Sequence, residues 1–192
     1  MLSVVKIGGS LYCEPELAVW LKTLAAIDKR IVIVPGGGPF ADTVRQLQKQ
    51  TGISDTTAHQ MALLAMEQYG LLLCDMQTGL TPANNQDEIF KALNKGKIPV
   101  WLPSQMCMHA TGITQDWSMT SDSLAAWLAS ILDAESLILI KHGNPADDMG
   151  LDTLSTAGWV DAAFPNYASQ FGRTIKIFGR NESHRFKDVH AH

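Results

Sequence analysis

Five short apolar runs constrain the fold of this chain more than any other feature of its sequence. They cover residues 3–7, 31–34, 98–102, 136–140 and 174–178. Continuous runs of this length are typical of parallel strands that are buried on both faces. Segments whose apolar residues recur at helical spacing lie between them, at residues 14–28, 39–51, 55–74, 86–94 and 121–132. The alternation predicts an α/β fold with a mainly parallel central sheet and helices on both sides.

Length and composition narrow the domain organisation and the possible partners. A chain of 192 residues is long enough for one domain with a sizeable core. The net charge is −4 and no basic stripe occurs, which argues against nucleic acid as a partner. The three cysteines are irregularly spaced and no apolar run approaches the length of a membrane span. We therefore expect a cytoplasmic protein with reduced thiols, no membrane contact and no metal site built from cysteine and histidine.

Two of the apolar runs end in glycine-rich turns. The first is followed by Gly8, Gly9 and Ser10, and the second by Gly36, Gly37 and Gly38. In parallel sheets ligands bind beyond the carboxyl ends of the strands, and glycine lets backbone N–H groups close on an anion. Lys6 precedes the first turn by two residues and could reach the same anion. Tight strand-to-helix turns are the alternative, but two such turns and a lysine favour an anion site.

Polar side chains crowd the start of the helix predicted at residues 121–132. Thr120, Ser121 or Asp122 could cap that helix, which is the simplest interpretation. A cap alone would not need so many polar residues. An aspartate that faces two lysines would instead organise them around a phosphoryl group in transfer.

The motifs KxGGS, PGGG and TSDSLAA, in this order, make residues 2–140 resemble the amino acid kinase superfamily. That superfamily includes N-acetylglutamate, uridylate and isopentenyl phosphate kinases. The resemblance implies a three-layer αβα sandwich and transfer of the γ-phosphoryl group of ATP, with Mg²⁺, to a small anionic or phosphorylated acceptor. It also implies a homo-oligomer.

The resemblance also implies roles for individual residues. Lys6 and Asp122 correspond to the catalytic lysine and to the aspartate that organises the lysines. The groups implied at the nucleotide phosphates are Gly8, Gly9, Ser10, Thr120 and Ser121. The groups implied at the acceptor are Gly36, Gly37, Gly38 and His59. For His59, which lies on the helix predicted at residues 55–74, the resemblance implies contact with the acceptor phosphate, and a histidine on the helix surface is the alternative interpretation.

The chain departs from the superfamily pattern after residue 140. Only about fifty residues remain, and the usual GGM…K segment with its second lysine is missing. The resemblance therefore implies one domain over residues 1–192, with an acceptor and phosphate-loop part at 1–135 and a shortened nucleotide part at 136–192. Lys141 could replace the missing lysine as a third catalytic residue, with a solvated lysine at the strand end as the alternative.

The short form narrows the expected substrate. Residues 58–70 and 155–169 resemble the small kinases of methanofuran-type C1-carrier biosynthesis, which are proposed to phosphorylate an aminomethylfuran phosphate. Two alternatives stay open: a uridylate-type nucleoside monophosphate kinase, and a non-catalytic module that binds a small molecule on a kinase scaffold.

Three structural expectations concern the remaining segments. Residues 141–153 are rich in Gly, Pro and Asp, which predicts a loop. The polar residues 181–192 are expected to be frayed or to pair with another subunit. Trp117 and Trp127 are expected to lie in the core.

Overall fold

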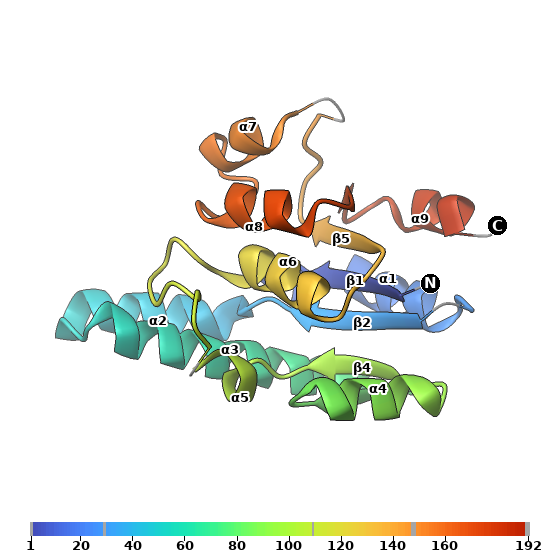
Figure 1. Cartoon of the computed structure of the whole chain (residues 1–192), viewed down its shortest axis with the longest axis horizontal. Coiled ribbons are helices and arrows are strands. Elements are labelled where there is room, and N and C mark those ends of the chain that lie inside the picture. The colour runs from blue at the N-terminus through green and yellow to red at the C-terminus, as the bar shows by residue number, and fades with distance from the viewer. Residues whose placement is uncertain (1, 29, 109, 147–148, 191–192) are drawn as a thin grey trace.

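The chain folds around a six-stranded sheet in which every pair of neighbouring strands is parallel (Figure 1). The computed structural model describes residues 2–28, 30–108, 110–146 and 149–190. The strands are β1 (Leu2–Ile7), β2 (Arg30–Pro35), β3 (Leu80–Ala83), β4 (Ile98–Trp101), β5 (Ser136–Lys141) and β6 (Thr174–Gly179). Their order across the sheet is β3-β4-β2-β1-β5-β6. The chain thus builds outward from β1 to one side and returns to its other side with β5, which makes a topological switch point beside β1.

Helices cover both faces of the sheet. They are α1 (Glu16–Ala25), α2 (Gly38–Thr51), α3 (Asp55–Met76), α4 (Gln86–Asn94), α5 (Ser104–Cys107), α6 (Ser121–Ile131), α7 (Leu151–Thr156), α8 (Phe164–Phe171) and α9 (Ser183–His190), with a short 3₁₀ turn at Gly9–Leu11. One core joins the sheet to α4, α6 and α8, and a second joins its other face to α1, α9 and part of α3. The predicted three-layer sandwich with a parallel sheet is confirmed.

Successive side chains of β1 point to opposite faces of the sheet, and this decides on which side of the sheet Lys6 lies. Val4 belongs to the core beneath α6, whereas Val5 and Ile7 belong to the core beneath α1. Because side chains alternate between the faces of a strand, Lys6 points to the α6 side, at the carboxyl end of the strand. The same alternation in β5 places Lys141 on the α6 side.

The structure corrects three expectations about individual segments. The sequence analysis predicted five strands, and the structure adds a sixth: β3 is short and contains Pro82, so it gives no continuous apolar run, yet it pairs with β4 over four residues. The segment predicted to be a loop to residue 153 ends earlier, because α7 begins at Leu151. The polar end is not frayed over residues 183–190: it forms α9, whose buried Phe186 makes edge-to-face contacts with Trp20 and Phe178.

No helix in the described part of the chain has both the length and the apolar character that crossing a membrane requires.

Candidate active site

A buried aspartate joins two lysines at the switch point of the sheet. Lys6 Nζ lies 2.9 Å from Asp122 Oδ1, and Lys141 Nζ donates a hydrogen bond of 2.7 Å to Asp122 Oδ2. The side chains of Lys6 and Asp122 are only 5% and 6% exposed, and that of Lys141 is 14% exposed. Two cations and one carboxylate leave one net positive charge in a region that water barely reaches. A buried positive charge of this kind is suited to binding an anion.

Neighbouring charges shift the pKa values of Asp122 and Lys141. Burial alone would raise the pKa of Asp122, but Lys6 and Lys141 lower it to about 2, so its carboxylate is charged at neutral pH. Burial and the charge of Lys6 lower the pKa of Lys141 to about 8, against the opposing effect of Asp122. Lys141 is therefore not a solvated lysine at the strand end; it is a buried cation close to its titration point.

The cap of α6 comes from a residue that the sequence interpretation missed. None of the three candidate side chains at residues 120–122 caps the helix; the carboxylate of Asp161 does so from the segment before α8. Its Oδ2 accepts from the N–H groups of Thr120 (3.0 Å) and Ser123 (3.1 Å) and from the Thr120 hydroxyl (2.8 Å), and Oδ1 accepts from the Ser123 hydroxyl. The charge of Asp161 also raises the pKa of Lys141. Asp161 thus holds the helix turn that carries Asp122.

The two glycine turns pack directly against each other. A Cβ atom on Gly9 would lie 2.3 Å from the Gly38 nitrogen, and one on Gly36 would lie 2.3 Å from the Gly9 nitrogen. Gly38 also has a φ of +55°, a conformation that favours glycine. The sequence therefore needs glycine here because two backbones meet without room for side chains.

Not all of the predicted glycines are available to a ligand. The Gly8 N–H donates to the carbonyl of Ile140 (2.9 Å), and the Gly36 N–H donates to the carbonyl of Ile7 (2.8 Å). These two glycines therefore extend the sheet, and the prediction that their N–H groups face an anion is wrong. Gly37 and Gly38 start α2, where the first N–H groups of a helix have no partner within it. Such a start favours an anion.

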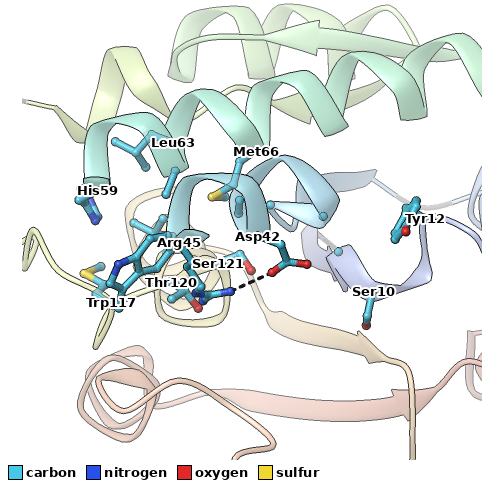
Figure 2. Close-up of a pocket in the computed structure, with 17 residues that line it drawn as sticks. Ser10, Tyr12, Asp42, Arg45, His59, Leu63, Met66, Trp117, Thr120 and Ser121 are labelled. Atoms are coloured by element: carbon cyan, nitrogen blue, oxygen red, sulfur yellow. Dashed lines mark hydrogen bonds and ion pairs between the residues drawn. The ribbon is translucent and has the colours of Figure 1, made fainter. Parts of the chain in front are cut away.

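A cavity of about 240 Å³ opens beside the two glycine turns (Figure 2). Its walls come from both turns, from α2 and α3, and from the start of α6. They include most of the predicted ligand-binding residues, namely Gly9, Ser10, Gly37, Gly38, His59, Thr120 and Ser121. Gly8 and Gly36 do not line it, in keeping with their place in the sheet. Its middle is apolar, with Leu63, Met66 and Met119 among the lining side chains.

The end of the cavity opposite the glycine turns is polar. Arg45 lies 4.3 Å above the ring of Trp117 and forms an exposed ion pair with Asp42 at 3.3 Å. Trp117 Nε1 donates to Gln48 Oε1 at 2.6 Å. Trp117 is only half-buried and lines the cavity, so its assignment to the core is wrong. Trp127, by contrast, packs against the core and stacks on Trp101.

His59 is buried rather than on the helix surface. The side chain is 5% exposed, lines the cavity, and has no hydrogen-bond partner at Nε2 within the described structure. Burial lowers the pKa of His59, while a hydrogen bond to the Asp116 backbone and the charge of Asp116 oppose the shift. The net direction keeps the ring neutral at neutral pH.

The described residues contain no group of three or more His, Cys, Asp and Glu side chains that could hold a metal ion.

Comparisons with known proteins show what the chain is similar to. The model of the family described as "Amino acid kinase family" matches residues 1–144. The curated protein "[5-(aminomethyl)furan-3-yl]methyl phosphate kinase" of Methanocaldococcus jannaschii is 29% identical over 203 residues, which cover 98% of this chain and 92% of that protein.

Solved structures share the fold. Uridylate kinase from Archaeoglobus fulgidus superposes with a TM-score of 0.71 at 16% identity and covers 98% of this chain and 94% of its own. Isopentenyl phosphate kinase from T. acidophilum gives a TM-score of 0.64 at 13% identity, with 98% and 95% covered. At such low identity these two likenesses concern the fold alone.

Proposed function

Because the chain belongs to the amino acid kinase family, we propose that it transfers the γ-phosphoryl group of ATP to a small phosphorylated acceptor. Aminomethylfuran phosphate, the substrate in the name of the Methanocaldococcus jannaschii relative, is the first candidate. The observation that carries the proposal is the buried Lys6–Asp122–Lys141 cluster, whose Asp122 directly follows Ser121 in the wall of the cavity at the glycine turns. Two lysines held by one carboxylate match the charge requirement of phosphoryl transfer.

The proposed reaction needs positioning and positive charge rather than covalent catalysis. An oxygen of the acceptor phosphate attacks the γ-phosphorus, and the bond from that phosphorus to the oxygen bridging the β-phosphate breaks, which releases ADP and a diphosphate product. Lys6 and Lys141 would stabilise the charge on the transferring group, and Asp122 would keep both ammonium groups in place. These groups are already paired and buried, so little reorganisation is needed.

The glycine turns fit a phosphate on each side of the reaction. Gly9 and Ser10 would face the phosphates of ATP, and the start of α2 at Gly37 and Gly38 would face the acceptor phosphate. The close approach of the two turns brings these two sites together, which transfer between two phosphates requires. Mg²⁺ would be carried by the phosphates of ATP.

The shortened nucleotide part still leaves room for a base. A second hollow of about 420 Å³ lies against the edge strand β6, between that strand and the segment around α7. Its walls include apolar side chains from both sides, among them Leu151, Leu154, Ile175 and Phe178. We assign the adenine of ATP to this hollow, since apolar walls suit a flat ring.

We expect kcat/KM to fall as the pH rises through about 8, because Lys141 must be protonated to act and its pKa is about 8. A Lys has its charge below its pKa, so the activity is present below this range and lost above it. Lys141→Arg should remove this alkaline fall, because arginine keeps its charge at every pH tested. Steady-state kinetics between pH 6 and about 9.5 on both proteins check the prediction. The same alkaline fall in both proteins would contradict it.

Asp161→Ala should lower both stability and activity. The loss of a helix cap costs about 1–2 kcal/mol of unfolding free energy. The absence of the Asp161 charge should also move the alkaline fall in kcat/KM to lower pH, because that charge raises the pKa of Lys141. A purely structural role would not move the pH profile. Asp152→Ala, on the exposed face of α7, is the matched control and should change neither quantity.

The proposal as a whole is tested by ADP release in the presence of ATP and Mg²⁺. The acceptors would be aminomethylfuran phosphate, UMP, isopentenyl phosphate and N-acetylglutamate, each against a blank without acceptor. We expect turnover with aminomethylfuran phosphate and little above the blank with the others. Preference for UMP would support the uridylate-type alternative. Binding without turnover of any acceptor would support the non-catalytic alternative.

A further inference from the structure

We propose that His59 is the specificity residue for the acceptor and that its Nε2 accepts a hydrogen bond from a primary ammonium group at the end of the acceptor remote from its phosphate. The acceptor class is then a phosphorylated small ring compound with a protonated amine. This inference rests on the proposed function and adds the residue that recognises the amine of the acceptor.

The hydrogen bonding of His59 leaves one acceptor unused. Nδ1 is the nitrogen that can meet the Asp116 backbone carbonyl, because Nε2 is buried without a partner. A neutral imidazole that donates from Nδ1 has its lone pair on Nε2. The ring lies at the wall of the cavity, at the end near Trp117 and Arg45 (Figure 2). A buried polar atom without a partner is costly, so a ligand that donates to Nε2 would remove that cost.

His59 is too far from the glycine turns to share one phosphate with them. Gly38 lies against the ring of Tyr69, since a Cβ atom there would be 3.6 Å from Tyr69 Cγ and Cδ2. His59 and Tyr69 belong to the same helix, ten residues apart, which corresponds to about 15 Å along the axis. A ligand whose phosphate lies at Gly37 and Gly38 therefore reaches His59 only with its other end. The apolar side chains of Leu63 and Met66, between the two ends, suit the ring.

Hydrogen bonding at this end, rather than its net charge, favours a donor group. Asp116 contributes a carboxylate, whose pKa is lowered by hydrogen bonds from Ser118. Arg45 contributes a positive charge above Trp117, whereas its exposed partner Asp42 is one helical turn from Gly38. With a neutral His59, the charges of Asp116 and Arg45 at this end balance. An ammonium group would donate to Nε2, whereas a second phosphate without a proton would offer that acceptor atom only further acceptors.

The test compares aminomethylfuran phosphate with the same phosphate in which the aminomethyl group is replaced by a methyl group. Binding of each compound is measured by titration calorimetry, and phosphorylation is measured with ATP and Mg²⁺. The proteins are the unaltered chain, His59→Leu, His59→Gln and, as a matched control, Gln60→Leu on the exposed side of the same helix. Thermal melts show whether each variant is folded.

We expect the unaltered chain and Gln60→Leu to bind the amine compound at least about tenfold more tightly than the methyl compound. His59→Leu should lose this preference through weaker binding of the amine compound, with affinity for the methyl compound within about twofold of the unaltered chain. His59→Gln, which retains an acceptor oxygen, should recover part of the preference.

The outcomes separate this inference from the function on which it rests. If the amine compound is phosphorylated but His59→Leu keeps the full preference, the inference is overturned and the kinase proposal stands. If the amine compound binds through His59 but no phosphoryl group is transferred, the kinase proposal fails and the assignment of His59 stands. If neither compound binds to the unaltered chain, both are overturned.

Discussion

Replacing Lys6 with methionine should lower kcat by a factor of about 10²–10³ and leave the chain folded. Lys6 supplies half of the positive charge at the proposed reaction centre, where water is nearly excluded. Methionine retains much of the aliphatic volume of lysine. Asp122 keeps Lys141 as a partner in the variant, so no buried carboxylate is left without a counter-charge. The loss should therefore appear in turnover rather than in stability.

Steady-state ADP release and thermal unfolding check this prediction together. Lys22→Met, at an exposed position on α1, is the matched control and should behave like the unaltered chain. A Lys6→Met protein that melts normally and turns over at the unaltered rate would remove Lys6 from the reaction centre.

Asp122→Asn should have the largest combined effect on stability and activity. The change leaves Lys6 and Lys141 facing each other without a counter-charge, and breaking a buried ion pair in this way costs about 3–5 kcal/mol of unfolding free energy. The pKa of Lys141, which Asp122 raises, should fall further, so that Lys141 loses its proton near neutral pH. Activity is then lost because Lys141 is no longer charged, and also because Asp122 no longer holds it in place.

The acid dependence of stability gives a second readout for Asp122. Its folded-state pKa of about 2 lies below the ordinary value of 3.8, so its stabilising effect is complete above about pH 4. That contribution is lost as the pH falls from about 4 to about 2. Urea unfolding over this range should show the loss in the unaltered chain and in the exposed control Asp75→Asn, but not in Asp122→Asn. Equal unfolding free energies for Asp122→Asn and the control at neutral pH would contradict the account.

Much of the fold could be predicted because its signals are local in the sequence. Continuous apolar runs identified five of the strands, and the strand–glycine pattern identified the two turns that meet at Gly9 and Gly38. The expectation that Asp122 faces two lysines also corresponds to the ion pairs that the structure contains. Lys141 takes part in these ion pairs, although the sequence was also compatible with a solvated lysine at the end of the strand.

The rest depends on contacts between distant segments. Asp161 caps a helix forty residues earlier in the chain, which no local capping pattern reveals. Trp117 looked like a core residue because of its size, but the pairing with Arg45 and Gln48 holds it at the cavity wall. The polar segment at residues 183–190 forms α9, and its buried aromatic side chain, Phe186, packs this helix against Trp20.

The most direct test of the central claim is mass spectrometry of aminomethylfuran phosphate after incubation with the chain, Mg²⁺ and ATP labelled in its γ-phosphoryl group. The account predicts an acceptor product that has gained one labelled phosphoryl group, in an amount equal to the ADP formed, and almost none with Lys6→Met. An unchanged acceptor, whether ATP is left intact or is hydrolysed to ADP and free phosphate, would contradict it.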